Sequence, residues 1–226
     1  MNEIYGLVRG PLALAAIVVF VAGLIFQARR FFSLTSEKPI VLPPASLLGK
    51  IEPRSGPSLD AINNSMLGVH PFLTVITTIF HVCLIMLPIF LLAHNVLLYE
   101  SFGFSLFVFP ELVANIITVI VILGGVFFFL RRIFVYRVRA ITTLYDYIIL
   151  LIVAAPFLTG YMATRQWFDY DTMLILHILS GEVMLVAIPF TKLKHGLLFF
   201  LYRYLMRYEH SLGSGTRVWS YSKSVK

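Results

Sequence analysis

The sequence predicts an all-α membrane protein whose five transmembrane helices form one domain over residues 1–226. Hydrophobic residues make up 59% of the chain, charged residues make up 13%, and the mean hydropathy is +0.88. Soluble domains carry about 25% charged residues, so this chain cannot cover a water-facing surface. A soluble enzyme, a disordered tail and a secreted disulfide scaffold are therefore excluded. The single Cys83 excludes an intramolecular disulfide and a cysteine-ligated iron–sulfur cluster.

Five apolar segments are long enough to cross the membrane, because about 20 residues of helix cover about 30 Å of hydrocarbon. Each segment should be a helix, since a lone strand cannot satisfy its backbone in lipid. The expected helices cover residues 11–28, 71–99, 110–130, 142–164 and 172–208.

The first, second and fifth helices each have a distinctive feature. The first helix is interpreted as retained, because Arg29 and Arg30 follow its apolar run, whereas a cleaved signal peptide has its positive charge in front. The second is long enough to tilt. The fifth contains Glu182 and Lys192 and is expected to continue past both.

Basic residues are distributed unevenly between the loops. Of the 18 Lys and Arg residues, 16 follow the first, third or fifth helix, and only Arg9 and Arg165 lie on the other side. The positive-inside rule makes the basic side cytoplasmic, which predicts a periplasmic amino terminus and a cytoplasmic carboxyl terminus. The net charge of +7 is then explained by topology, without a nucleic-acid partner. The long cytoplasmic loop 33–66 is either a docking surface for another subunit or a solvated loop.

Four histidines fall on the second and fifth helices, where a ligating side chain is costly and indicates function. His177 and His195 are 18 residues apart, which is five helical turns and about 27 Å along one face. Since the second helix runs antiparallel to the fifth, His94 lies near the level of His177 at the outer side. His81 lies deeper and can pair with His195.

Two stacked histidine pairs fit two bis-histidine haem b groups, one near each membrane face. The haem would not be covalently attached, because the chain has no Cys-x-x-Cys-His motif. His81 and His94 do not share one face of an ideal helix, but Pro88 can kink the helix between them. Pro189 can do the same between His177 and His195.

Other interpretations of the histidines stay open. His70 competes as a ligand in place of His81 or His94, although it lies at the inner interface. The four rings can also be packing residues bonded to backbone carbonyls. The chain would then be a haem-free membrane scaffold or assembly subunit. A small transporter is the third interpretation, and it depends on Glu182 alone.

The chain resembles the gamma subunit of respiratory nitrate reductase, a five-helix dihaem cytochrome b. The matching stretches are GGVFFFLRRIFVYRVRAITTLYDYIILL at 124–151, LILHILSG at 174–181, PFTKLKH at 189–195 and IFHVCLI at 79–85. It also resembles the cytochrome b subunits of transmembrane redox complexes of sulfate-reducing bacteria, such as the high-molecular-weight cytochrome c complex.

The resemblance implies a multi-pass electron-transfer subunit in a bacterial cytoplasmic membrane. One haem would be ligated by His81 and His195, and the other by His94 and His177. It further implies menaquinol oxidation near the outer haem, and partners that include a periplasmic multihaem cytochrome c and cytoplasmic iron–sulfur proteins. No Lys occurs between Lys50 and Lys192, so a lysine of the outer quinol pocket in nitrate reductase has no counterpart and the quinone site stays open.

Two acidic residues lie within the expected helices. Glu182, five residues after His177, is either a proton relay coupled to the outer haem or a hydrogen-bonded structural acid. Asp146 begins the fourth helix, and we expect a structural hydrogen bond from it to the inner loop.

Overall fold

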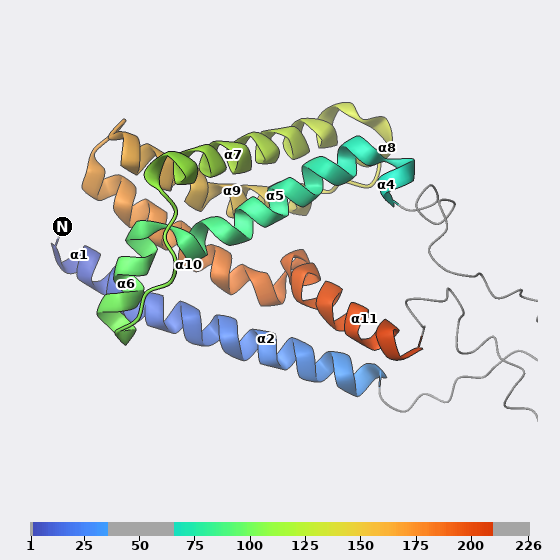
Figure 1. Cartoon of the computed structure of the whole chain (residues 1–226), viewed down its shortest axis with the longest axis horizontal. Helices are drawn as coiled ribbons and strands as arrows, with labels where there is room; N and C mark the ends of the chain where they lie inside the picture. The colour runs from blue at the N-terminus through green and yellow to red at the C-terminus, as the bar shows by residue number, and fades with distance from the viewer. Residues whose placement is uncertain (1, 36–65, 210–226) are drawn as a thin grey trace, which may run out of the picture.

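Helices are the only regular elements among residues 2–35 and 66–209, which are the residues that the computed structural model describes (Figure 1). Five helical segments are long and apolar enough to cross a membrane: Glu3–Leu34, Pro71–Phe90, Glu111–Phe134, Leu144–Arg165 and Tyr170–Phe190. The expected all-α class and the number of spanning helices are confirmed.

The first span is longer than expected. It runs through α1 (Asn2–Leu7), the π-helical turn η1 (Val8–Leu12) and α2 (Ala13–Thr35). Pro11 lies within η1, and a proline, which lacks an N–H, favours this kind of local widening of a helix. Most of the expected loop 33–66, with its proposed docking surface, lies outside the described residues.

The second span is broken, so the expectation of one helix over 71–99 was wrong. After the short α4 (Met66–Val69), α5 (Pro71–Phe90) ends two residues after its internal proline, and α6 (Leu92–Phe102) begins after Leu91. Leu91 is extended, with ψ 135°. Pro88 disturbs the helix that contains it, and the chain leaves the helical path one turn later.

The third and fourth spans form a hairpin. They are α7 (Glu111–Phe134) and α9 (Leu144–Arg165), joined through α8 (Tyr136–Arg139). Asp146 accepts hydrogen bonds from the backbone N and the Oγ1 of Thr143, both 2.9 Å, and so completes a capping box at the start of α9. The structural role expected for Asp146 is confirmed.

The fifth span is also broken. It consists of α10 (Tyr170–Phe190), the 3₁₀ turn η3 (Lys192–Lys194) and α11 (His195–Glu209). Its expected continuity was wrong, because Thr191, two residues after Pro189, is extended. The helical spacing between His177 and His195 therefore does not hold across the break. Asp169 caps the other end of α10, where hydrogen bonds from Thr172 lower the pKa of the Asp169 carboxyl.

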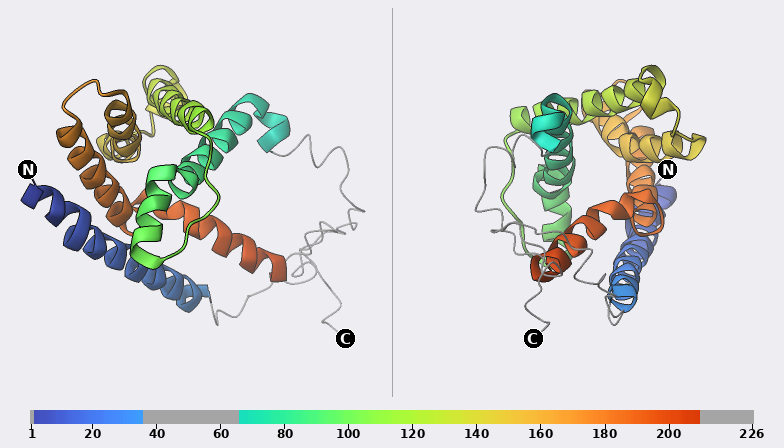
Figure 2. Two further views of the ribbon diagram at one scale, coloured as in Figure 1. Left: turned by 60° about the vertical axis from the view of Figure 1, so that its left-hand side comes forward. Right: turned by 90° about the vertical axis from the view of Figure 1, so that its right-hand side faces the viewer.

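The spans are neighbours in the order α2, α10, α9, α7, α5, as Figure 2 shows. Their apolar core lies between α5, α7 and α9 and contains Phe80, Leu87, Ala114, Val121, Val153 and Phe157. The two broken spans, α5–α6 and α10–α11, are not among the pairs that pack closely within the described residues. Side chains have to bridge the space between these two spans.

Candidate functional site: two histidine pairs

Two pairs of imidazole rings join the broken spans. The ring centroids of His94 on α6 and His177 on α10 lie 6.0 Å apart, and their planes are inclined by 18°. The centroids of His81 on α5 and His195 on α11 lie 5.9 Å apart, with planes inclined by 88°. The structure thus brings together the same two pairs that residue spacing and helix direction indicated.

These centroid separations match those of two imidazole rings that bind one metal ion from opposite sides. A metal–imidazole bond is about 2.0 Å long, and the ring centroid lies about 1.1 Å behind the bonded nitrogen. Two rings on opposite sides of one metal ion therefore have centroids about 6.2 Å apart. Both observed distances fall within about half an ångström of this value.

All four rings have the same hydrogen-bonding pattern, in which Nδ1 faces a backbone carbonyl oxygen. The acceptors are Thr77 O for His81 (2.7 Å), Pro88 O for His94 (2.8 Å), Pro156 O for His177 (2.8 Å) and Lys192 O for His195 (2.9 Å). A carbonyl can only accept, so Nδ1 carries the hydrogen. Nε2 of the neutral ring then keeps its lone pair, as in metal-bound histidines. Among the described residues, none is hydrogen-bonded to any of these Nε2 atoms.

The break after α5 positions His94. The last carbonyls of a helix have no partner within it. Here Pro88 O accepts from His94, Ile89 O accepts from Asn95 Nδ2 (2.9 Å), and Phe90 O accepts from the N–H of Phe109 (2.9 Å). Asn95 is only 2% exposed, and its Oδ1 accepts from the N–H of Leu106 (2.8 Å). The break, the ligating candidate and the following loop therefore form one hydrogen-bonded unit.

A glycine on α9 makes room for His177. A Cβ atom at Gly160 would lie 2.9 Å from both Cε1 and Nδ1 of the His177 ring. The carbonyl of Pro156, one turn earlier on α9, fixes the tautomer of the same ring. The face of α9 from Pro156 to Gly160 therefore serves as the seat of His177.

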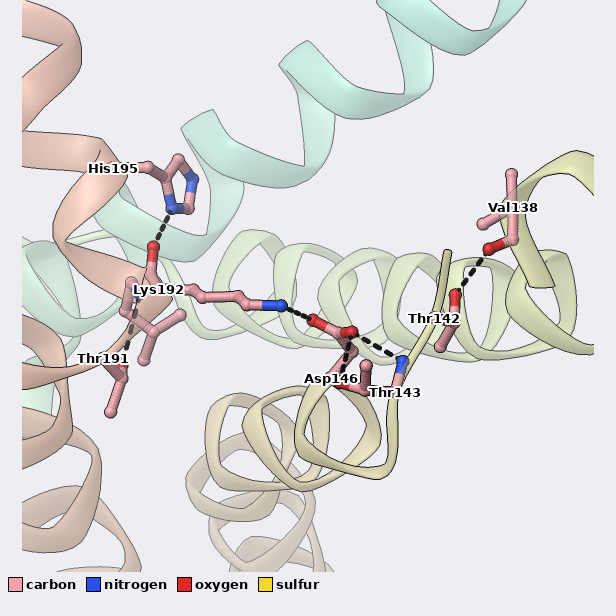
Figure 3. Close-up of polar contacts among 8 residues, drawn as sticks. Val138, Thr142, Thr143, Asp146, Thr191, Lys192 and His195 are labelled. Atoms are coloured by element: carbon pink, nitrogen blue, oxygen red, sulfur yellow. Dashed lines mark hydrogen bonds and ion pairs between the residues drawn. The ribbon is translucent and has the colours of Figure 1, made fainter. Parts of the chain in front are cut away.

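The position of the His195 ring depends on the break at Thr191. In Figure 3, Lys192 reaches from η3 to the start of α9, where its Nζ contacts Asp146 Oδ1 at 2.6 Å. The backbone carbonyl of the same lysine accepts the Nδ1 hydrogen bond of His195. Thr191 stabilises the break, since its Oγ1 donates to Ala187 O (2.7 Å) and accepts from the N–H of Leu193 (3.2 Å).

The remaining histidines lie apart from both pairs. His70 precedes α5, is exposed, and is paired with no histidine ring among the described residues. His210 lies outside the described residues. The structure therefore brings His81, and not the competitor His70, to His195.

A metal ion held by protein side chains alone does not fit this arrangement. Within residues 2–35 and 66–209, no group of three or more His, Cys, Asp or Glu side chains is placed to bind a metal. Two facing imidazoles instead suit a metal whose other ligands come from a planar macrocycle, as in bis-histidine haem. The residues present fit that group.

Glu182 lies on α10, between His177 and His195 in the sequence. Its side chain is 7% exposed. Neither carboxyl oxygen has a hydrogen-bond partner in the described part of the chain.

Two residues of this site were missed by the analysis of the sequence. Asn95 adjoins a predicted ligand, but an asparagine in an apolar run does not reveal which carbonyls it will meet. Gly160 lies next to Thr159 in an apolar helix, where a glycine more often marks a plain helix contact. The one signal available for Asn95 was a polar residue in an apolar run, beside His94 and seven residues after Pro88.

Comparison with known proteins adds a relative but no activity. No protein-family model matches the chain. The chain is 46% identical over 145 residues to a protein of Nitratidesulfovibrio vulgaris (strain Hildenborough), which carries only the name "Protein". The match covers 64% of each chain, so this chain spans less than two thirds of the length of the curated relative it matches. These comparisons assign no function to the chain.

Proposed function

We propose that this chain is a dihaem cytochrome b subunit that carries electrons across a membrane within a larger redox complex. One observation carries the proposal: two histidine pairs with ring centroids 5.9 and 6.0 Å apart, in which every Nδ1 faces a backbone carbonyl. Packing rings bonded to backbone carbonyls would explain the distances and the Nδ1 contacts, but not why the Nε2 atoms of both pairs have no hydrogen-bond partner among the described residues. The sparse contact between α5–α6 and α10–α11 supports the same conclusion, since close helix packing would exclude a flat group.

His94 with His177, and His81 with His195, would hold the two haem groups. Haem bound at these pairs supplies one-electron transfer, whose potential depends on the ligands, burial and nearby charge. The backbone carbonyls hold each Nε2 in the form that can bind a metal. Gly160 leaves room for the ring of His177, and Asn95 stabilises the helix break that precedes His94. The side chains of His94 and His177 are half-buried on apolar helices.

The orientation proposed for the chain places the outer pair toward the periplasm and the inner pair toward the cytoplasm. The basis is the excess of Lys and Arg after the first, third and fifth spans. Electrons would pass between the two pairs along the membrane normal.

The partners proposed are those that the family resemblance implies. They are menaquinol or a periplasmic multihaem cytochrome c at the outer side, and cytoplasmic iron–sulfur subunits at the inner side. Substrate chemistry would belong to these subunits, and the chain itself would transfer electrons. Menaquinol oxidation at the outer haem is part of this proposal.

The test is a reduced-minus-oxidised spectrum with pyridine haemochrome quantitation on the purified complex. We expect two b haems in the unchanged chain, and the loss of one haem in each of H177A and H195A. The matched control is H70A, which removes an exposed histidine outside both pairs and should keep both haems. If the unchanged chain binds no b haem, the proposal fails and the haem-free scaffold takes its place.

A further inference from the structure

We propose that Glu182 is a proton-binding site, which gains a proton when the outer histidine site is reduced and loses it on oxidation. This inference rests on the proposed function. It assigns proton binding to the interface between α2 and α10, a role that haem ligation by the histidines does not require.

The first observation is that the carboxyl group is buried without a partner. Glu182 is 7% exposed, and both Oε1 and Oε2 are buried with no hydrogen-bond partner among the described residues. Native proteins rarely leave a buried polar side chain unsatisfied, and such exceptions require an explanation.

The second observation is where the side chain lies. Glu182 and Pro189 are seven residues apart on α10, which is nearly two full turns, so they share one face. Pro189 meets α2, because a Cβ atom at Gly23 would lie 2.6 Å from its Cγ. The face of α10 that carries Glu182 therefore points toward α2.

A second buried polar residue at this interface provides a comparison. Gln27 on α2 is 7% exposed, and its Nε2 donates to Pro189 O at 2.7 Å. Gln27 therefore has a structural bond that accounts for its burial. Glu182 has none, which separates it from an ordinary interhelical contact.

An unpaired buried carboxylate is strongly destabilised, whereas the neutral acid is tolerated much better. The carboxyl group therefore binds a proton unless a positive charge lies nearby. The charge at the outer site changes with its redox state, because the site is more positive when it is oxidised.

Among the described residues, the elements packed closely against α10 are α2, α9, η1 and η3. The lysines of η3 follow Glu182 by ten and twelve residues, and Lys192 is paired with Asp146. The segments 13–27 of α2 and 148–160 of α9 contain no titratable residue. In η1, Arg9 is exposed and paired with Glu100. On α10 itself, the titratable side chains between residues 172 and 190 are His177 and Glu182.

The spacing makes the expected coupling measurable. Glu182 follows His177 by five residues, a rise of about 7.5 Å. A unit charge about 10 Å away, at an effective dielectric constant of about 20, changes a proton affinity about tenfold. One electron that arrives at the outer site from a quinol or a cytochrome c is then accompanied by uptake from water of up to about half a proton, averaged over the molecules, at the Glu182 carboxylate. Oxidation releases both the electron and this bound proton.

The experiment is redox-induced infrared difference spectroscopy on the purified complex, in H₂O and in D₂O. The unchanged protein should show a carboxylic-acid carbonyl band that appears on reduction and shifts in D₂O. The band should be absent in E182Q and displaced in E182D, which keeps a carboxyl group at a new position. The matched control is E111Q, which makes the same chemical change at an exposed glutamate at the start of α7 and should leave the band intact.

The haem spectrum of each sample is measured first, so that the two proposals can fail separately. Absence of b haem from the unchanged protein overturns the proposed function and this inference with it. Two intact haems with no redox-linked carboxyl band overturn this inference alone. A band that persists in E182Q, or one that E182D leaves in place, also overturns it, because the proton then lies on another group.

Discussion

At the scale of single residues, the outer pair depends on the absence of a side chain. Gly160 borders the His177 ring so closely that any Cβ atom would lie 2.9 Å from two of its atoms. Real Cβ atoms do not approach other atoms this closely, so the ring or the helix would have to move. The position of His177 is therefore set from α9 as well as from its own helix.

We predict that G160A removes the outer haem and keeps the inner one. Overpacking at such a contact costs about 1–3 kcal/mol, so the melting temperature should also fall. Haem quantitation and thermal unfolding of the complex measure both effects. The control is G181A, because a Cβ atom at Gly181 meets nothing within 4 Å. Equal haem loss in the two variants would contradict the prediction.

At the scale of elements, both spans that carry the paired histidines are interrupted shortly after a proline. The chain leaves the helix at Leu91 after Pro88, and at Thr191 after Pro189. Each break supplies what a histidine needs: a free carbonyl for His94, and a short turn that presents the Lys192 carbonyl to His195. The interruptions are therefore part of the site.

Removing either partner of the ion pair between Lys192 and Asp146 should shift the midpoint potential of the nearby haem, in opposite directions for the two partners. Removing the positive charge in K192Q should lower the midpoint potential of the inner haem, and removing the negative charge in D146N should raise it. A unit charge roughly 10 Å away is worth about 20–70 mV for effective dielectric constants of 80 to 20. Redox titration in the visible range measures both shifts.

The controls follow from the same geometry. The double variant D146N/K192Q restores the local charge, so its potential should return close to that of the unchanged protein. K194Q removes a neighbouring charge on η3 that has no ion pair in the described part of the chain. It should leave the positioning of His195 unchanged, which the spectrum of the inner haem monitors. Shifts of equal sign in K192Q and D146N would refute the prediction.

Sequence reasoning predicted the number of spans, the kinking prolines and the pairing of His94 with His177 and of His81 with His195. These features follow from apolar length, from backbone chemistry and from the direction of each helix. It did not predict where the chain leaves the helix, because a proline weakens a helix without selecting the residue that becomes extended. It also missed Asn95 and Gly160, whose roles depend on contacts with Leu106 and His177 that no local pattern contains.

At the scale of the whole molecule, the helices form an open series that the histidine pairs close. Neighbours pack in the order α2, α10, α9, α7, α5 (Figure 2). The histidine rings of α5 and α6 reach back to those of α11 and α10. The helix hairpin α7–α9 thus separates the two halves of each pair in the sequence but not in space.

The proposed orientation predicts which loops are accessible from outside the cell. In a C83S background, S105C in the loop before α7 should react with a membrane-impermeant maleimide in intact cells. A140C, in the turn between α8 and α9, should react only after the membrane is opened. Both native residues are exposed, so burial does not limit either reaction. Labelling of A140C but not of S105C in intact cells would indicate the opposite orientation.

The sequence positions of the paired histidines also impose an order on biosynthesis. His94 precedes His177 by more than 80 residues, and His81 precedes His195 by more than 110. At about 5–20 residues per second, the first member of each pair waits roughly 4–20 s for its partner to leave the ribosome. The pair of His94 and His177 cannot exist before α10 has been made, and the pair of His81 and His195 cannot exist before α11 begins. Any group held between the rings must therefore enter a bundle whose first four spans have already been made.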